Sequence, residues 1–338
     1  MQCIEIGKGS EKSMDPQQNS NSSERYQATI PETLSGKRFD VALAKLFPEF
    51  SRSRLQSWIR SGGALIAGER RRPRDSVKEG EEVVLEVERE EEVQWEAEDI
   101  PLNILHEDDS LLFIDKPAGM VVHPAVGNWK GTLVNALLHH DSTLAEVPRA
   151  GIVHRLDKDT SGVLAVAKTL EAHTHLVRQL QERAMQREYQ AICKGVMTAG
   201  GTVDAPIGRH RVDRKKMAVT EGGKVAVTHY RVMEKFRSHT HIRLTLETGR
   251  THQIRVHTEH IRFALLGDPV YGHRLQIPAA SSERMATTLR GFRRQALHAA
   301  RLGLEHPLSG EYIELESTLP NDMAELIEVL REDREAHS

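Results

Sequence analysis

One short loop carries the side chains with the clearest chemical potential. It reads His154-Arg155-Leu156-Asp157-Lys158-Asp159-Thr160-Ser161-Gly162 and lies between two apolar runs, 151–153 and 163–167. Both runs are short and rich in β-branched or small residues, so both are predicted to be strands. Arg155 and Asp157 are two residues apart and project the same way from an extended chain. An ionised carboxylate held above a rigid sheet can attack carbon or accept a proton.

The residues alone leave a second role open for Asp157. Turns favour aspartate because its side chain accepts hydrogen bonds from the nearby backbone, so Asp157 could be a structural cap. Asp159 could pair with Asp157 like the two carboxylates of a glycosidase, although a cap at the turn is the simpler interpretation of Asp159. Gly162 is predicted to close the turn because glycine adopts backbone conformations that other residues avoid.

The elements that must position this loop are predicted to alternate between short strands and helices. Residues 111–114 form one expected strand, and 241–247 form another in which apolar and polar side chains alternate. Two helices are expected from apolar stripes, which contain Leu176, Val177, Leu180 and Ala184 in 170–184, and Met323, Leu326, Ile327 and Leu330 after Pro320. The mixture predicts an α+β fold with a mainly antiparallel, mixed β-sheet.

Composition narrows the class of protein. A chain of 338 residues with 38% hydrophobic and 28% charged residues predicts a folded protein of two or more domains. It contains no run of 18 apolar residues and no apolar leader, so neither a membrane span nor a secretory signal is expected. Cys3 and Cys193 are the only cysteines, which suggests a reducing cytoplasm and no cysteine-based metal site.

Charge is unevenly distributed along the chain. The formal net charge is −3, but residues 205–262 carry thirteen Lys and Arg against five Asp and Glu. Residues 51–78 are also basic, whereas 79–99 carry eleven acids and one base. Because nucleic-acid affinity depends on a local patch rather than on the total charge, two basic zones are compatible with RNA binding.

The same patterns predict four consecutive regions. Residues 1–33 are rich in Gln, Asn and Ser and are predicted to be a disordered tail. Residues 34–90 are expected to form a small separate α+β domain, followed by an acidic linker at 91–99 and a larger domain at 100–332.

The small domain is expected to contain a basic helix. Ser51 is a suitable N-cap for a helix that buries Leu55, Trp58 and Ile59 and ends at Gly62-Gly63. One face of this helix is expected to carry three basic residues, Arg52, Arg54 and Arg60. These arginines favour RNA binding, and the alternative is a solvated face on a protein–protein interaction module.

Several segments together carry a family resemblance. The loop at 154–162 closely resembles the signature loop of the RluA/RluD family of pseudouridine synthases. Further segments resemble the other motifs of that family in order, at 187–191, 206–210, 216–219, 248–257, 267–272 and 294–299. The resemblance spans about residues 35–332 and implies the α+β fold of these synthases. The pattern Ser-Arg-Ser-Arg, Trp-Ile and Gly-Gly in the small domain resembles an S4 RNA-binding domain.

The resemblance implies a reaction and assigns roles to residues. Family enzymes convert uridine in RNA to pseudouridine without redox chemistry, so no cofactor and no metal are expected. Asp157 is implied as the nucleophile, Arg250 as its partner and Tyr189 as the residue against the target base. Arg155 is implied to fill the gap left by a flipped nucleotide. The other expected phosphate or active-site contacts are His154, Lys116, His252 and Arg255.

The resemblance also implies a substrate. Within the family it points to 23S ribosomal RNA or a precursor of the large ribosomal subunit, at the helix 69 stem-loop, modified by a cytoplasmic monomer. Bases in single-stranded loops are the accessible ones. Two alternatives stay open: a related synthase acting on another rRNA or tRNA site, and a non-catalytic S4-type ribosome-assembly factor.

Overall fold

The computed structural model describes residues 23–48, 50, 52–88, 95–124, 127–213 and 216–338. The chain folds into two compact units, which meet between residues 94 and 95 of the sequence. We call them the N-terminal unit and the C-terminal unit. None of the described helices is long and apolar enough to cross a membrane.

The N-terminal unit packs two helices on a small antiparallel sheet. The strands β1 (Ser23–Thr29), β3 (Glu82–Glu88) and β2 (Ala64–Ile66) lie in that order. Helices α1 (Phe39–Leu46) and α2 (Arg52–Ser61) cover the sheet after a 3-10 turn, η1 (Glu32–Leu34). Helix α2 buries Leu55, Trp58 and Ile59 as predicted. It ends before Gly62, whose φ of +91° is a conformation that favours glycine.

Two predictions for this unit are wrong. Residues 23–33 are ordered, because β1 pairs along its length with β3 and Tyr26, Ala28 and Ile30 face the core at a period of two. Arg52, Arg54 and Arg60 do not share a helix face, since at 3.6 residues per turn Arg54 lies about 160° from Arg52 and about 120° from Arg60. The predicted N-cap Ser51 and residues 1–22 lie outside the described residues.

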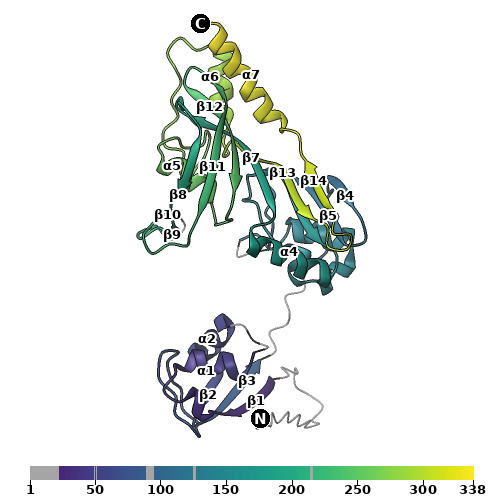
Figure 1. The fold of residues 1–338 in the computed structure, drawn as a ribbon, viewed down its shortest axis with the longest axis vertical. Helices are drawn as coiled ribbons and strands as arrows, with labels where there is room; N and C mark the ends of the chain where they lie inside the picture. The colour runs from purple at the N-terminus through teal and green to yellow at the C-terminus, as the bar shows by residue number, and fades with distance from the viewer. Residues whose placement is uncertain (1–22, 49, 51, 89–94, 125–126, 214–215) are drawn as a thin grey trace. The chain divides into compact units, whose positions relative to one another are not determined.

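The C-terminal unit is built on one nine-stranded sheet (Figure 1). Its order is β4-β5-β6-β13-β7-β12-β11-β8, and β14 pairs with β13. The bounds are β4 Ile104–Glu107, β5 Leu111–Lys116, β6 Ser161–Ala167, β7 Gln186–Lys194, β8 Gly201–Asp204, β11 Val227–Lys235, β12 His239–Leu246, β13 Leu297–Glu305 and β14 Tyr312–Glu316. A separate hairpin pairs β9 (Ile207–Arg209) with β10 (Met217–Val219). The β6–β13 pairing is parallel and the other strand pairings are antiparallel, which confirms the predicted mixed sheet.

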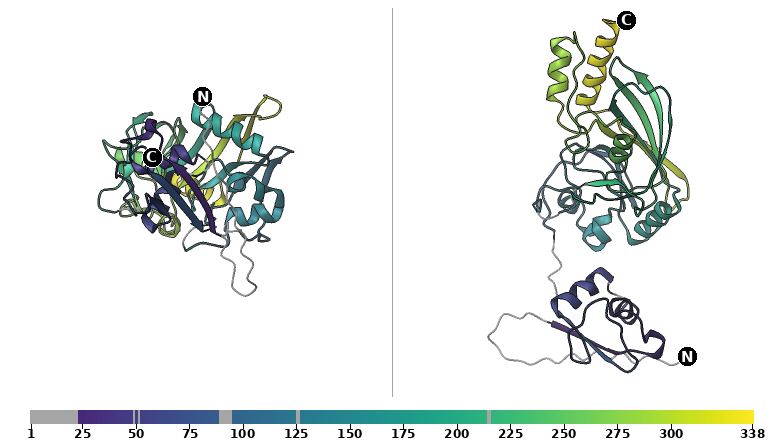
Figure 2. Two further views of the ribbon diagram at one scale, coloured as in Figure 1. Left: turned by 90° about the horizontal axis from the view of Figure 1, so that it is seen from below. Right: turned by 90° about the vertical axis from the view of Figure 1, so that its left-hand side faces the viewer.

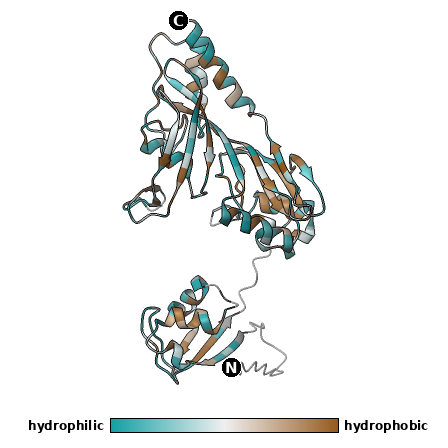
Figure 3. Cartoon of the chain, in the orientation of Figure 1, coloured by the Kyte–Doolittle hydropathy of each residue, from teal (hydrophilic) through white to brown (hydrophobic). Residues whose placement is uncertain are grey.

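Helices cover both faces of this sheet. They are α3 (Leu133–His140), α4 (Leu170–Glu182), α5 (Gln253–His260), α6 (Glu283–Gly291) and α7 (Asn321–Glu335), with 3-10 turns η2 (Ser142–Glu146) and η3 (Pro148–Gly151). Helices α6 and α7 lie side by side (Figure 2). Along β5, Leu112 and Ile114 join one apolar cluster while Leu111 and Phe113 join another, so apolar residues concentrate on this strand (Figure 3). A strand buried on both faces has a continuous apolar sequence.

Most predicted elements of this unit are confirmed, with three corrections. Residues 151–153 form no strand: Gly151 lies in η3, and Ile152 makes a single antiparallel bridge to Val166. Helix α4 ends at Glu182 because Arg183 adopts a left-handed conformation, so Ala184 lies outside the helix. The predicted linker is wrong for 95–99, where Trp95 packs on the core, while 91–94 lie outside the described residues.

Candidate active site

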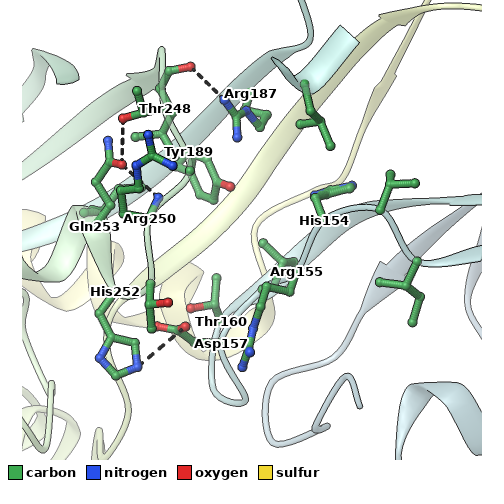
Figure 4. A pocket seen from close by; sticks show the side chains of 18 of the residues that line it. His154, Arg155, Asp157, Thr160, Arg187, Tyr189, Thr248, Arg250, His252 and Gln253 are labelled. Atoms are coloured by element: carbon green, nitrogen blue, oxygen red, sulfur yellow. Dashed lines mark hydrogen bonds and ion pairs between the residues drawn. The ribbon is translucent and has the colours of Figure 1, made fainter. Parts of the chain in front are cut away.

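A cavity of about 860 Å³ opens where the loop 152–157 meets the turn after β12 (Figure 4). Strand β7 contributes Tyr189 to its wall, and α5 contributes its first residues. The sheet order explains this convergence, because β13 lies between β6 and β7 and brings the loop beside the central strands. Side chains that are distant in the sequence therefore meet in one pocket.

Backbone packing holds the loop 154–162 against β13. Gly162 has a φ of +112°, and a Cβ atom at this position would overlap the carbonyl oxygen of Ala299. The prediction that this position needs glycine is confirmed. The backbone N–H of Thr160 donates to the carbonyl of Asp157 at 3.0 Å, and Gln295 donates to the Thr160 hydroxyl at 3.1 Å. The loop is thus fixed on the C-terminal side of Asp157.

The Asp157 carboxylate is held by Arg255 on α5. The Arg255 Nη1 donates to Asp157 Oδ2 at 2.9 Å. The same guanidinium donates through Nε and Nη2 to the buried Asp268, at 2.7 and 2.9 Å. Burial alone would lower the pKa of Arg255, but its hydrogen bonds and the charges of Asp268 and Asp157 raise it. Asp268 therefore fixes Arg255, and Arg255 fixes one oxygen of Asp157.

The predicted partnership between Arg250 and Asp157 is wrong. Arg250 lies in the turn before α5, where its Nε donates to the carbonyl of Val225 at 3.0 Å, although its side chain still lines the cavity. Gln253 shapes this turn by accepting from the Arg250 N–H and donating to the Val227 carbonyl, each at 3.0 Å. The register of α5 thus turns Arg255 rather than Arg250 toward the carboxylate.

His252 faces the second oxygen of Asp157. Its Nε2 lies 3.8 Å from Asp157 Oδ1, and its Nδ1 lies 2.9 Å from the hydroxyl of Tyr271. The backbone of His252 has a φ of +57°, an unusual conformation for a residue with a side chain. Burial lowers the pKa of His252, and the charge of the nearby Asp157 opposes this shift.

Tyr189 on β7 forms part of the wall of the cavity. Its backbone is paired with Leu244 on one side and Ala299 on the other, so it occupies the middle of the sheet. The side chain is 7% exposed, and burial raises the pKa of its hydroxyl. A rigid aromatic face beside a carboxylate provides a surface on which a flat ring can stack. Ile254 and Val256 are buried packing residues.

Comparisons with known proteins decide the family. A family profile described as "RNA pseudouridylate synthase" matches residues 110–260. The "Ribosomal large subunit pseudouridine synthase D" of Pseudomonas aeruginosa is 59% identical over 91% of this chain and 97% of its own length. This chain belongs to the RNA pseudouridylate synthase family.

Other members agree with this assignment. The protein of the same name from Escherichia coli K12 is 55% identical over 92% of this chain and 95% of its own. The solved structure "Human RNA Pseudouridylate Synthase Domain Containing 4" is 28% identical, with a TM-score of 0.51 over 68% of this chain and 93% of the other. The chain is therefore an RNA pseudouridine synthase with the fold of its family, as the loop resemblance implied.

Three further residues of the synthase were expected to contact RNA or to lie in the active site, and the structure places them differently from one another. Lys116 is fully buried, and its Nζ donates to three backbone carbonyls at 2.8–3.0 Å, so the predicted phosphate contact is wrong. Burial lowers the pKa of Lys116 to about 8. His154 accepts a hydrogen bond from the Ala165 N–H, and burial lowers its pKa to about 3, so it is neutral. Arg155 is exposed and lines the cavity, where a nucleic acid can reach it.

Of the other arginines predicted to bind RNA, some are paired with carboxylates and others are exposed. Arg255 is committed to two carboxylates and only 6% exposed, so it contacts Asp157 rather than phosphate. In the N-terminal unit, Arg52 is paired with the buried Asp40, whereas Arg54 and Arg60 are exposed. Among the described residues, no group of three His, Cys, Asp or Glu side chains is arranged to hold a metal ion.

Proposed function

We propose that this synthase converts specific uridines of 23S ribosomal RNA to pseudouridine, at the helix 69 stem-loop of the large subunit. The names of relatives that are 54–59% identical over about 91% of the chain support the ribosomal substrate. One structural observation carries the chemistry. Asp157 has one oxygen held by Arg255, while its other oxygen lies in a cavity beside Tyr189.

The proposed reaction rearranges one nucleotide without an external reagent. The N1–C1′ bond of uridine breaks, and both bonding electrons stay on uracil. In the nucleophilic route, an oxygen of Asp157 bonds to C1′. Uracil turns, C5 bonds to C1′ and the carboxylate is released. Loss of the C5 proton and gain of one at N1 complete an isomerisation, which needs no cofactor.

The target base must leave the RNA stack to reach Asp157. Extruding a base costs about a few kcal/mol, and an inserted side chain can occupy the vacated space. Arg155 is suited to this role because it is exposed, lies two residues before Asp157 and lines the cavity. Its guanidinium can stack on neighbouring bases and contact phosphate.

We propose that the N-terminal unit is an S4-like RNA-binding domain. Its helix α2 and the loop after β2 carry the exposed basic residues Arg54, Arg60, Arg70 and Arg74. Such side chains can neutralise phosphates and release counterions. In this proposal the protein acts as a cytoplasmic monomer, and its N-terminal unit increases affinity for the RNA rather than taking part in the chemistry.

Pseudouridine mapping tests the proposed substrate. Total RNA from cells lacking the protein is compared with RNA from cells that carry the wild type or Asp157→Asn. A signal in the helix 69 loop that requires the wild type supports the proposal. A signal elsewhere in rRNA or in tRNA identifies a related synthase with another site. Equal pseudouridine in all three samples, together with a ribosome-assembly defect, would favour the alternative of a non-catalytic assembly factor.

Removing residues 1–94 should weaken RNA binding and reduce its dependence on salt. Each lost phosphate contact lowers the slope of log affinity against log salt by about 0.7 for single-stranded RNA, so losing two contacts should lower it by about 1.4. Conversion at saturating RNA should persist, because Asp157, Tyr189 and Arg255 all lie in the C-terminal unit. Filter binding between about 50 and 200 mM salt measures the slope.

A full-length variant provides the matched control for this deletion. Arg54→Gln with Arg60→Gln should reproduce part of the change in slope while keeping the unit intact. An unchanged slope in both proteins would show that the N-terminal unit does not touch RNA and would favour a protein–protein interaction module.

A further inference from the structure

Arg187 differs from the other buried cations of this protein. Among the described residues, three lysine or arginine residues are buried: Lys116, Arg187 and Arg255. The ammonium of Lys116 donates to three carbonyls at 2.8–3.0 Å, and the guanidinium of Arg255 pairs with two carboxylates. Both cations therefore have close partners in the folded chain.

The guanidinium of Arg187 is poorly satisfied. The residue is 8% exposed, and Nη2 donates to the carbonyls of Leu246 and Glu247 at 3.4 Å, the long limit for a hydrogen bond. Its Nε is buried with no hydrogen-bond partner, and it forms no ion pair with any carboxylate of the described residues. A buried charge without a counter-charge is unfavourable, so its presence calls for a physical explanation.

The position of Arg187 offers an explanation for its buried charge. It lies on β7 two residues before Tyr189, so both side chains project from the same face of the strand. Both line the cavity that contains Asp157. The hydroxyl of Tyr189 is within electrostatic range of both Arg187 and Asp157, and Figure 4 draws Tyr189 between them. A ring stacked on Tyr189 with its sugar at Asp157 would therefore extend toward Arg187.

The chain also leaves room for this guanidinium. Gly249, in the turn after β12, has no side chain, and a Cβ atom built there would lie 2.6 Å from Arg187 Nη1. An alanine at this position would displace the end of the Arg187 side chain. The turn and the strand thus cooperate to keep an unpaired cation at the wall of the active-site cavity.

We propose that Arg187 stabilises the uracil anion that forms when the N1–C1′ bond breaks. In that step both bonding electrons remain on uracil, and the negative charge spreads from N1 onto O2 and O4. A preorganised cation in a dry site favours charge that develops in the transition state more than it favours the neutral base. The missing counter-charge of Arg187 is then the leaving group itself. When C5 bonds to C1′ and N1 gains a proton, the anion disappears.

This role differs from phosphate binding in a measurable way. A backbone phosphate carries its charge before, during and after the reaction, so losing a phosphate contact weakens binding and its salt dependence. Losing a contact to the uracil anion lowers the rate of the chemical step and leaves binding almost unchanged. The inference rests on the proposed role of Asp157, which places the sugar at one end of the cavity.

The test compares Arg187→Met and Arg187→Lys with the wild-type protein, using the RNA stem-loop that pseudouridine mapping identifies. Arg187→Met should lower the single-turnover rate constant at saturating enzyme by about 10²–10³-fold, the effect of removing one donor to a developing anion. Its dissociation constant for the RNA should change by less than about threefold, because the contact forms only in the transition state. Arg187→Lys, which keeps the charge, should recover part of the rate.

Thermal stability distinguishes this role from a structural one. Removing an unpaired buried cation should leave the melting temperature of the RNA-free protein unchanged or raise it. Arg301→Met is the matched control, since Arg301 also has a buried Nε without a partner but its charge is paired with Glu314 and Glu316. That variant should convert RNA at the wild-type rate. Gly249→Ala should slow conversion while keeping the arginine.

Each other outcome would overturn the inference. An Arg187→Met protein with a wild-type rate, or with a loss confined to affinity and salt slope, excludes stabilisation of the anion. A lower melting temperature with a rate loss that Arg187→Lys does not relieve would assign Arg187 to the fold. Asp157→Asn in the same assay separates the two proposals: if it stays active, the proposed site is wrong, whereas an inactive Asp157→Asn beside an active Arg187→Met refutes only the role of Arg187.

Discussion

Asp157→Asn should abolish pseudouridine formation while leaving the protein folded and able to bind RNA. The amide has nearly the size of the carboxylate but is a far weaker nucleophile, and loss of an activated nucleophile costs several orders of magnitude in rate. The neighbourhood should survive the change, because Asp268 still holds Arg255 through two hydrogen bonds. Single-turnover conversion and the dissociation constant for RNA measure the two effects separately.

Asp159→Asn is the control for this prediction. Asp159 lies in the same loop. Its backbone carbonyl accepts a hydrogen bond from Arg294 at 3.2 Å. This variant should retain substantial activity. Near-normal conversion by Asp157→Asn together with loss of activity in Asp159→Asn would show that the nucleophile has been assigned to the wrong residue.

Arg255→Lys should lower the rate by about 10²-fold or more, because a displacement of the reacting group by about 1 Å has an effect of that size. A lysine keeps the positive charge but cannot donate in the fixed plane that joins Asp157 to Asp268. Arg255→Ala should be worse, since a buried carboxylate at Asp268 without its partner destabilises the fold by about 3–5 kcal/mol. Rates at saturating RNA and urea unfolding measure these outcomes.

Arg250→Lys provides the comparison for Arg255→Lys. Arg250 lines the same cavity and donates to a backbone carbonyl instead of a carboxylate. Its conservative replacement should therefore have the smaller effect on the rate of conversion. A larger loss in Arg250→Lys than in Arg255→Lys would mean that the carboxylate changes partners when RNA binds.

The sequence predicted the mixed sheet, the C-terminal helix and the turn that ends at Gly162, because each depends on local patterns. Alternating or continuous apolar residues identify strands such as β5 and β12, and Gly162 marks the turn beside Asp157. The same reasoning missed β1, since a polar composition concealed the period of two formed by Tyr26, Ala28 and Ile30. Composition alone therefore fails to identify a strand in a polar segment in which every second residue is apolar.

The partner of Asp157 was beyond the reach of sequence patterns for a different reason. Arg250 and Arg255 lie five residues apart, on either side of the point where a turn becomes α5, and their directions depend on where the helix begins. The shape of this turn depends on the hydrogen bond between Arg250 and Gln253, and the direction of the Arg255 side chain depends on its pairing with Asp268. These contacts are set by tertiary packing, which no spacing in the chain encodes. Arg187 escaped notice because an arginine on a strand ordinarily faces water.

The parallel pairing of β6 with β13 has a consequence for how the protein is made. Ser161 and His298 are joined across this pairing by a hydrogen bond of 3.0 Å and are 137 residues apart. At a synthesis rate of about 5–20 residues per second, roughly 7–27 s pass between the two strands. During that interval the edges of β6 and β7 that later receive β13 are unpaired, and such edges can pair with other chains.

Nascent chains of this protein should therefore depend on protection of two strand edges until about the last eighth of the sequence, which begins with β13 at Leu297, emerges. A chain truncated before Leu297 should be cleaved within its C-terminal unit by low concentrations of protease, whereas the complete chain resists. Resistance of the truncated chain would show that the active-site loop can settle without β13. Asp157 and Arg255 lie in the middle of the sequence, yet we expect activity only after the end of the chain, which contains β13, has been translated.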